Sequence, residues 1–165
     1  MILVPGYGGG ASMLDHLASL LRNEGRTTTT LALPDDATGD LRGQEQVLAA
    51  AVSKALAGGA QSVDLVGYSA GGIVAGLFVA AHPSQVRRVV TLGSPLHGTR
   101  LAGLAAGLLP SECPTACRQM VPGSSLLASL DAASPVVTGV PWLSIWTSLD
   151  QVVTPPDSAR FSGAT

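Results

Sequence analysis

Apolar and polar residues alternate along this chain with two different periods. Short apolar and β-branched runs, typical of strands buried in a parallel sheet, occupy residues 1–4, 27–33, 63–66, 87–92 and 142–148. Leucine, valine and alanine recur at helical spacing in residues 11–23 and 41–56, and again from Ala70 onward. Such alternation of strands and helices predicts an α/β fold, in which helices cover both faces of a parallel sheet.

One segment, residues 99–138, breaks this alternation. It is rich in Gly, Pro, Ser and Leu and contains no strand-like run. A chain of 165 residues has the size of one domain with a substantial core. We therefore expect a single domain that carries 99–138 as an insertion. Asp40, just before the helical pattern of residues 41–56, is a candidate N-cap.

Composition argues against several classes of protein. A net charge of −2 and 12% charged residues do not suit a nucleic-acid-binding surface, which needs a basic stripe. No apolar run reaches the roughly 18 residues that suggest a membrane span. Met1 is followed at once by an apolar run without basic residues, so we expect a core strand there and no signal peptide.

The strongest local motif is Gly67-Tyr68-Ser69-Ala70-Gly71, a G-x-S-x-G sequence between a predicted strand and a predicted helix. In this context it predicts a nucleophile elbow, a sharp turn that holds an exposed serine in a strained conformation. We expect glycine to be needed at Gly67 and Gly71, two residues before and after Ser69, because a Cβ there would collide with neighbouring backbone.

Four sequence blocks occur in an order that resembles the α/β-hydrolase fold, and specifically small secreted bacterial lipases and esterases. They are residues 4–9 (VPGYGG), 67–72 (GYSAGG), 92–99 (LGSPLHGT) and 150–155 (DQVVTP). In such proteins further strands flank these blocks, so the resemblance implies that 1–165 is one α/β-hydrolase domain, incomplete at both ends. It also implies that 99–138 forms a cap or lid beside the pocket.

The resemblance implies a serine carboxylic-ester hydrolase that acts on acyl-ester or lipid substrates through an acyl-enzyme. Ser69 would be the nucleophile. The backbone N–H groups of Tyr7 and Ala70 would form the oxyanion hole. No cofactor and no metal is implied, and the oligomeric state stays open. Like its relatives, the protein would be secreted or located in the cell envelope.

Asp150 is the predicted acid of the triad, which would orient the catalytic imidazole. It follows the last predicted strand and matches the acid block of the family. Asp157 is the nearest competitor. Asp64 lies inside the elbow strand, too far back to reach the site, and Asp131 lies in the insertion.

The triad histidine is the gap in the pattern. The hydrolase order is Ser, acid, His, yet no histidine follows Asp150. The chain has only His16, His82 and His97, of which His97 is a weak candidate for the base. We expect the base to lie beyond Thr165, and the 165-residue chain to hydrolyse esters poorly or not at all.

Cys113 and Cys117 are the only cysteines. Three intervening residues are enough for a disulfide in a bent loop, and similar secreted lipases carry a comparable pair. Free thiols or a metal site are the alternatives, but no histidine cluster completes a zinc site. We therefore predict a disulfide.

Two other functions stay open at this stage. Residues 6–11 fit the G-x-G-x-x-A fingerprint of dinucleotide-binding proteins, although Asp35 and Asp36 lie farther on than the ~20 residues expected for the ribose-binding acid. The missing histidine also suits a non-catalytic binding protein on a hydrolase scaffold. Finally, seven leucines of the insertion suit either an acyl-chain site or an ordinary core, namely Leu101, Leu104, Leu108, Leu109, Leu126, Leu127 and Leu130.

Overall fold

The computed structural model describes residues 1–133, 139–161 and 163–165. Its centre is a five-stranded sheet in the order β2-β1-β3-β4-β5, and every pair of neighbouring strands is parallel. The strands are β1 (Ile2–Val4), β2 (Thr29–Thr30), β3 (Val63–Tyr68), β4 (Val86–Leu92) and β5 (Trp142–Ile145). The sheet confirms the α/β fold class that the alternating pattern predicts.

Two strands are shorter than their apolar runs predict. The run at 27–33 yields only β2, because its partner β1 has three residues and ends where Pro5, which has no N–H to donate, follows. The run at 142–148 yields β5 as far as Ile145. After it the chain turns, and the Asp150 N–H donates to the Thr147 carbonyl at 3.2 Å.

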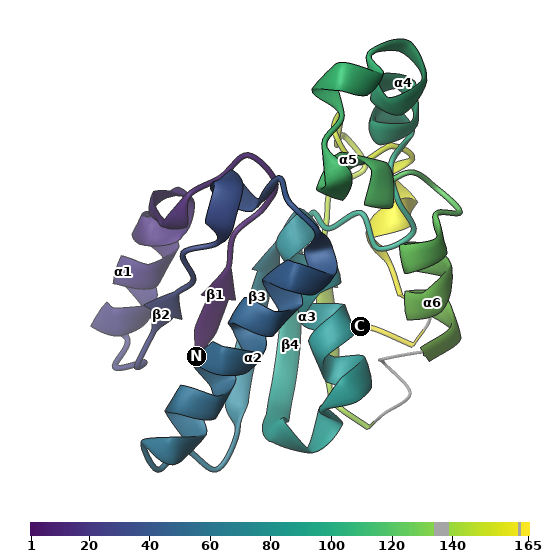
Figure 1. Cartoon of the computed structure of the whole chain (residues 1–165). Coiled ribbons are helices and arrows are strands. Elements are labelled where there is room, and N and C mark those ends of the chain that lie inside the picture. The colour runs from purple at the N-terminus through teal and green to yellow at the C-terminus, as the bar shows by residue number, and fades with distance from the viewer. Residues whose placement is uncertain (134–138, 162) are drawn as a thin grey trace.

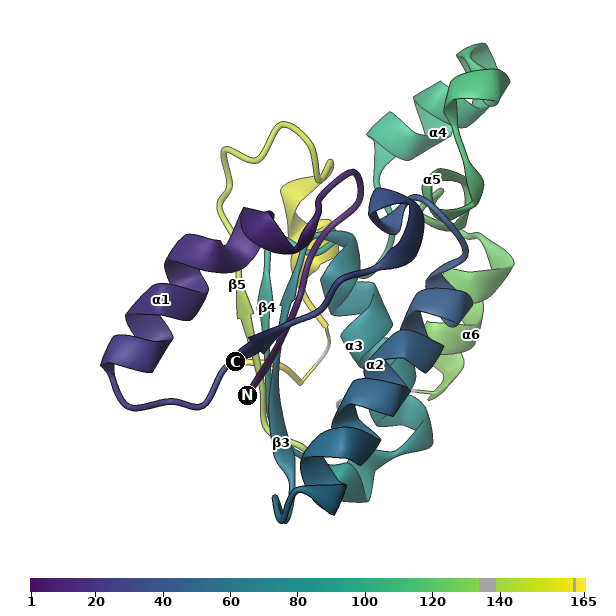
Figure 2. The same cartoon turned by 60° about the vertical axis from the view of Figure 1, so that its left-hand side comes forward.

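Helices cover both faces of the sheet, as Figure 2 shows. Helix α1 (Asp15–Asn23), preceded by the short 3-10 helix η1 (Ala11–Leu14), lies on one face. Helices α2 (Leu41–Ala57) and α3 (Ala70–Ala81) lie on the other. The predicted N-cap is confirmed, because the Asp40 side chain accepts a hydrogen bond from the Arg42 amide at 3.0 Å.

The core is divided by the sheet into two unequal parts. On the α1 face, Leu3 and Val66 of the strands pack with Leu14 and Ala18. The larger part lies on the other face, where α2 and α3 bury almost continuous apolar surface. Its fully buried members include Leu48, Val52, Leu65, Ile73, Val74 and Phe78.

The predicted insertion is helical in its described part. It contains α4 (Arg100–Leu108), η4 (Pro110–Glu112), α5 (Thr115–Gln119) and α6 (Ser125–Ala133). In Figure 1, α4 and α5 rise beyond the carboxyl ends of the strands, whereas α6 descends beside α3.

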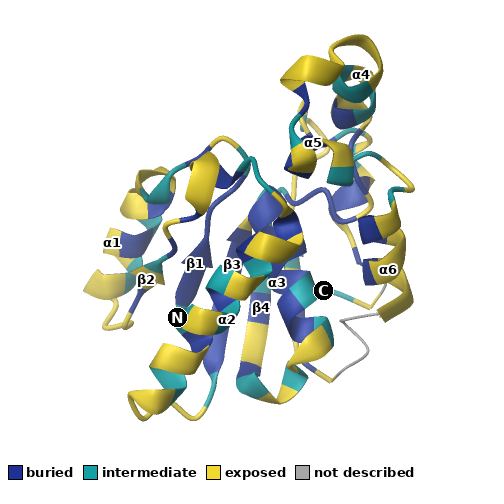
Figure 3. Cartoon of the chain, in the orientation of Figure 1, coloured by how far each residue is buried: buried dark blue, intermediate teal, exposed yellow. Residues whose placement is uncertain are grey.

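The seven leucines of the insertion divide between these helices. Leu126, Leu127 and Leu130 of α6 are at most 2% exposed and belong to the core. On and after α4, Leu101, Leu104, Leu108 and Leu109 are 48–75% exposed. Figure 3 shows α4 mostly in the colours of exposed and intermediate residues and α3 mostly in the colour of buried residues.

Further 3-10 helices among the described residues connect these elements, namely η2 (Pro34–Ala37), η3 (Pro83–Gln85) and η6 (Pro156–Ala159). Beside β5, Thr165 donates to the Trp142 carbonyl and accepts from the Ser144 amide, both at 3.0 Å, so it lies along the outer edge of that strand. No helix in the described ranges has the length and apolar character needed to cross a membrane.

The one carboxylate buried within a strand is neutralised locally. Asp64 on β3 is 7% exposed and accepts two hydrogen bonds from the Arg87 guanidinium, at 2.5 and 2.7 Å. The Arg88 Nε lies 3.4 Å from Asp64 Oδ1. These bonds from Arg87 hold the pKa of Asp64 below its ordinary value, although burial raises it. Asp64 therefore joins β3 to β4 through Arg87 and has a structural role, as its position in the elbow strand suggests.

Candidate active site at the carboxyl edge of the sheet

The strand order places a crevice at a defined point of the sheet. Strands β1 and β3 are neighbours, but the helices that leave β1 and enter β3 lie on opposite faces of the sheet. In open α/β sheets, ligands bind at such a switch point, outside the carboxyl ends of the strands. The loop that begins at Pro5 and the turn at Ser69 both lie there. The chain order therefore brings the two most distinctive sequence blocks together.

Ser69 has the backbone conformation expected of an elbow. Its φ is 51° and its ψ is −126°, in a region that residues other than glycine rarely occupy. It stands between the last residue of β3 and the first residue of α3, and its N–H donates to the Leu92 carbonyl of β4 at 2.9 Å. The side chain is half-buried at the carboxyl edge of the sheet.

Close backbone packing makes glycine necessary around this turn. A Cβ at Gly71 would overlap the Val4 carbonyl oxygen and lie 2.6 Å from that of Pro5. A Cβ at Gly67 would lie 2.5 Å from the Gly72 Cα. Because both obstacles are backbone, no side-chain rotation relieves them. Gly6 adds a third close approach, since its Cβ would lie 2.8 Å from that of Ser69.

Two backbone amides near Ser69 are those predicted for an oxyanion hole, and Ala70 itself is fully buried. The Ala70 N–H is the first of α3, where an amide has no partner inside the helix. The Tyr7 N–H lies in the loop after β1, next to Gly6. Neither amide has a hydrogen-bond partner within the described residues. The helix terminus adds a partial positive charge, so this corner of the site suits an oxygen that becomes negative.

A mostly apolar pocket of about 280 Å³ adjoins Ser69. Five lining residues come from loops that follow strands, namely Tyr7, Ser69, Pro95, Val152 and Val153. The insertion supplies the other seven, Thr99, Leu101, Ala102, Ala105, Glu112, Cys117 and Met120.

Asp150 lies in the turn after β5 and is held by backbone. Its Oδ1 accepts hydrogen bonds from the Val152 and Val153 amides, both at 2.9 Å. Val152 and Val153 thus fix the carboxylate and also line the pocket. Both of these bonds go to Oδ1, and none of the hydrogen bonds within the described residues uses Oδ2.

The position of Asp150 relative to Ser69 follows from β4. Oδ2 lies 3.5 Å from the place where a Cβ on Gly93 would stand, and Gly93 follows the residue whose carbonyl binds the Ser69 amide. Both side chains therefore lie at the same edge of the sheet, on either side of the end of β4. Within the described structure no hydrogen bond joins them directly. That an imidazole bridges the pair stays a prediction.

Asp157, the competing acid, lies in a different place. It lines a second pocket of about 280 Å³ together with His97, Arg160 and Phe161. His97 is held there by its own contacts. Its Nε2 lies 2.8 Å from the Arg160 carbonyl oxygen, and its Nδ1 lies 3.1 Å from Asp131 Oδ1. Neither His97 nor Asp157 lines the pocket beside Ser69.

The other two histidines are also remote from this pocket. His16 is exposed on α1, and His82 is the C-terminal residue that caps α3, with its ring 5.0 Å from that of Phe78. The structure thus brings together Ser69, the Tyr7 and Ala70 amides and Asp150, and it brings none of the three histidines to them.

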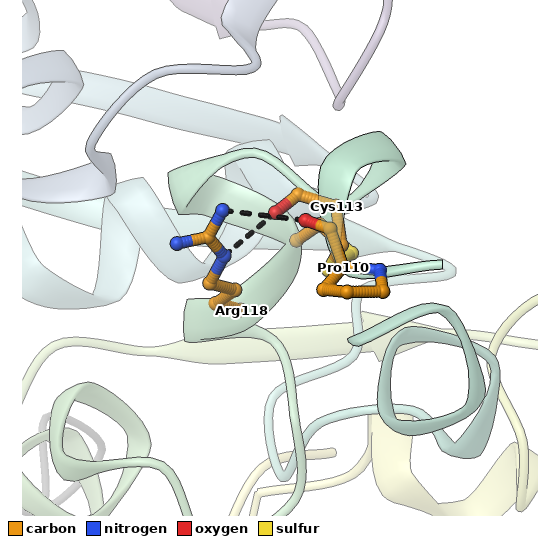
Figure 4. Close-up of a disulfide and its surroundings, with 4 residues drawn as sticks. Pro110, Cys113 and Arg118 are labelled. Atoms are coloured by element: carbon orange, nitrogen blue, oxygen red, sulfur yellow. Dashed lines mark hydrogen bonds between the residues drawn. A yellow bond between two sulfur atoms is a disulfide. The ribbon is translucent and has the colours of Figure 1, made fainter. Parts of the chain in front are cut away.

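The predicted disulfide between Cys113 and Cys117 is confirmed. It closes the turn between η4 and α5, and Cys117 lines the pocket. Arg118 supports the same turn, as Figure 4 shows, by donating to the Cys113 carbonyl at 2.8 Å and to the Pro110 carbonyl at 3.4 Å. The pocket wall is therefore reinforced by a covalent bond and a cation.

Sequence reasoning missed the residue that fastens this wall to the domain. Gln119 at the end of α5 accepts from the Leu41 amide at 2.8 Å and donates to Asp40 Oδ1 at 2.6 Å. The hydrogen bond from Gln119, followed by that from the Arg42 amide, lowers the pKa of Asp40. No local signal could have revealed it, because its partners lie 78 and 79 residues away.

Residues 1–103 match the model of the PGAP1-like alpha/beta domain family. The chain belongs to this family. The matched region contains the elbow and the loop after β1. No curated protein matches the sequence.

Solved structures of similar shape include several lipases. The mature Bacillus licheniformis lipase BlEst2 aligns with a TM-score of 0.69 at 24% identity, over 86% of this chain and 62% of that one. Aspergillus fumigatus lipase B aligns with a TM-score of 0.76 at 19% identity, over 99% and 40%. A monoacylglycerol lipase from Paleococcus ferrophilus gives 0.69 at 17% identity, over 96% and 76%.

At these identities the likeness shows the fold. The PGAP1-like chain has an α/β-hydrolase fold, as the four sequence blocks predict, and it spans about three fifths of the mature Bacillus lipase and 34% of the propeptide form.

Proposed function

We propose that this protein is a serine hydrolase of carboxylic esters that works through an acyl-enzyme. One observation carries the proposal: Ser69 occupies a strained turn at the switch point, beside two unpartnered amides and an apolar pocket. A nucleophile, an oxyanion hole and a site for an acyl group are the three parts that acyl transfer requires.

The chemistry assigned to these groups is as follows. Ser69 Oγ attacks the ester carbonyl carbon and gives its proton to an imidazole, and the carbonyl π electrons move onto the oxygen. The Tyr7 and Ala70 N–H groups donate to this oxyanion. When the intermediate collapses, the C–O bond to the alcohol breaks and the alcohol takes the proton. Water then repeats the sequence on the acyl-enzyme, which releases the acid and restores Ser69.

Asp150 is assigned to the imidazole rather than to the substrate. Its Oδ2 lies near Gly93 at the end of β4, the strand that separates Asp150 from Ser69. As described, none of His16, His82 and His97 lies in that place, so the proposal assigns the base to a histidine other than these. A disulfide at Cys113–Cys117 suits an oxidising compartment, and we propose that the protein is exported.

A second candidate is a non-catalytic binding protein on the same scaffold. It is favoured by the fact that no histidine lines the pocket among the described residues. The dinucleotide-binding alternative has less support, because the order β2-β1-β3-β4-β5 differs from the 3-2-1-4-5-6 order of dinucleotide-binding sheets.

A phosphonylation experiment with added imidazole tests the proposal. The chain is incubated with an alkyl fluorophosphonate, with and without imidazole as a replacement base, and the adduct is located by mass spectrometry. We expect an adduct on Ser69 that imidazole accelerates, and none in Ser69→Ala. Ser158→Ala is the matched control, because the Ser158 hydroxyl is buried and donates to the Gly98 carbonyl. A chain that stays unlabelled at Ser69 in both conditions is a binding protein, and the proposal is then wrong.

A further inference from the structure

We infer, on the basis of the proposed function, that the pocket beside Ser69 binds the acyl chain of a medium-length ester and that Ala105 of α4 sets the length it accepts. The inference rests on the lining of the pocket, on its volume and on the way its wall is held.

The lining selects an apolar chain. Among the described residues that line the pocket there is no lysine or arginine, and the only carboxylate, Glu112, is solvent-exposed. A ligand with a phosphate or a carboxylate group would therefore find no cationic side chain among these residues to pair with. The buried part of the lining includes Ala102, Cys117, Met120 and Val153, all 7% exposed or less. Alkyl groups gain most from contact with such a surface.

The volume sets an upper limit to the chain. If a methylene group needs about as much space as a water molecule in the liquid, on the order of 30 Å³, a pocket of about 280 Å³ accepts roughly nine carbons. The pocket volume of about 280 Å³ is just below the usual range of ~300–1,000 Å³ for ligand pockets. A longer chain has to leave the pocket past its exposed members, Leu101 and Val152.

The part of the pocket wall formed by α5 is held in place, so it does not move aside for a longer acyl chain. Cys117 is tied to Cys113, and Gln119 is hydrogen-bonded to the N-terminus of α2. Helix α4 instead limits the pocket by the small size of its side chains. Ala102 and Ala105 line the pocket with one methyl group each, and Ala105 is only half-buried. Ala105 is thus the place where added carbon atoms would occupy ligand space with least damage to the core.

Calorimetric titration with alkan-2-ones of five to thirteen carbons tests this inference. These probes carry a carbonyl and an alkyl chain but undergo no acyl transfer, so binding is measured in Ser69→Ala as well as in the wild type. We expect affinity to rise about fourfold per methylene, which corresponds to ~0.8 kcal/mol, and to level off near nine carbons. In Ala105→Leu the levelling should come about three carbons earlier.

The matched control is Gly107→Leu, which adds a leucine to the same helix where a Cβ meets nothing within 4 Å. It should leave the chain-length profile unchanged. If Ala105→Leu does not fold by circular dichroism, Ala105→Val should give a shift of about two carbons. Affinity that keeps rising to thirteen carbons, or identical profiles for the α4 variants, would overturn the inference. Because the probes need no reaction, this result and the labelling of Ser69 can fail independently.

Discussion

The turn at Ser69 and helix α4 line the same pocket, but they differ in how much space surrounds their glycines. Around the turn, Cβ atoms at Gly67 and Gly71 would meet backbone at 2.6 Å or less. On α4, Cβ atoms at Gly103 and Gly107 meet nothing within 4 Å. The groups to which we assign bond making are thus fixed by backbone packing, whereas α4, which lines the pocket, has positions where a side chain can be added. Under the proposed function, substitutions on α4 would alter the substrate and leave the chemistry unchanged.

The largest expected effect comes from filling the tight region. Gly71→Ala puts a methyl group into the carbonyl oxygens of Val4 and Pro5, so β1 and α3 must separate. We expect a loss of at least about 3 kcal/mol in the free energy of unfolding, at the upper end for overpacking. Urea denaturation followed by circular dichroism measures it. A loss below 1 kcal/mol would show that the elbow tolerates movement.

The disulfide, which lies in the insertion next to α4, should have the next largest effect on stability. Replacing Cys113 and Cys117 by serine removes a short covalent loop, for which the chain-entropy relation gives about 2 kcal/mol. Thermal unfolding measures the loss. A reducing agent should lower the Tm of the wild type to about that of the double variant and leave the Tm of the double variant unchanged. If the reductant has no effect on the wild type, the disulfide does not hold the wall.

The joint between the two regions should show a pH-dependent effect. Gln119→Ala removes its hydrogen bonds to Leu41 and Asp40, at a cost of about 1 kcal/mol. The folded pKa of Asp40 is lowered, so its contribution is complete above the unfolded pKa of about 3.9 and is lost as the pH falls through the folded pKa. The stability difference between wild type and variant should therefore be constant above pH 5 and shrink below pH 4.

Asp40→Asn is the control for this joint. It keeps a helix-capping side chain but does not titrate, so in an Asp40→Asn background the loss of stability caused by Gln119→Ala should not vary in the same acid window. A wild-type difference that stays constant down to pH 3 would mean that the carboxylate does not support the joint.

The smallest expected effect has the opposite sign. Gly103→Ala adds a methyl group to the interior of an exposed helix without a close contact. Alanine has the higher helix propensity, so the variant should be more stable by about 0.5–1 kcal/mol. Measured beside Gly71→Ala under the same conditions, it tests the contrast directly. A destabilised Gly103→Ala would show that α4 packs more tightly than its exposure indicates.

Much of the fold follows from local pattern. Strand β3, helix α3 and the turn between them were predictable because the apolar period changes from a strand run to helical spacing across the five residues of the motif. Helix α2 and its Asp40 cap follow from similar local signals. The disulfide was predictable because only two cysteines are present, four positions apart. In each case the residues that interact are near neighbours in the chain.

Extents were harder to predict than elements. The run at 27–33 looks like a full strand, but the length of β2 is set by its partner β1, which ends before Pro5. The seven leucines of the insertion look alike in sequence, yet those of α6 join the core against α3 and those of α4 stand in solvent. Apolar character gives a tendency to be buried, and the tertiary structure decides which surface is available.

The sequence by itself determined the order of strands and helices, the glycine-bounded turn at Ser69 and the disulfide, because these depend on backbone conformation and on neighbours a few residues away. Only the tertiary structure decided which polar side chains meet. It placed Asp150 across the end of β4 from Ser69, sent His97 to Asp131 and the Arg160 carbonyl, and joined Gln119 to a helix 78 residues earlier. A hydrogen bond acts only over about 3 Å, so partners far apart in the chain are fixed by the packing of whole elements.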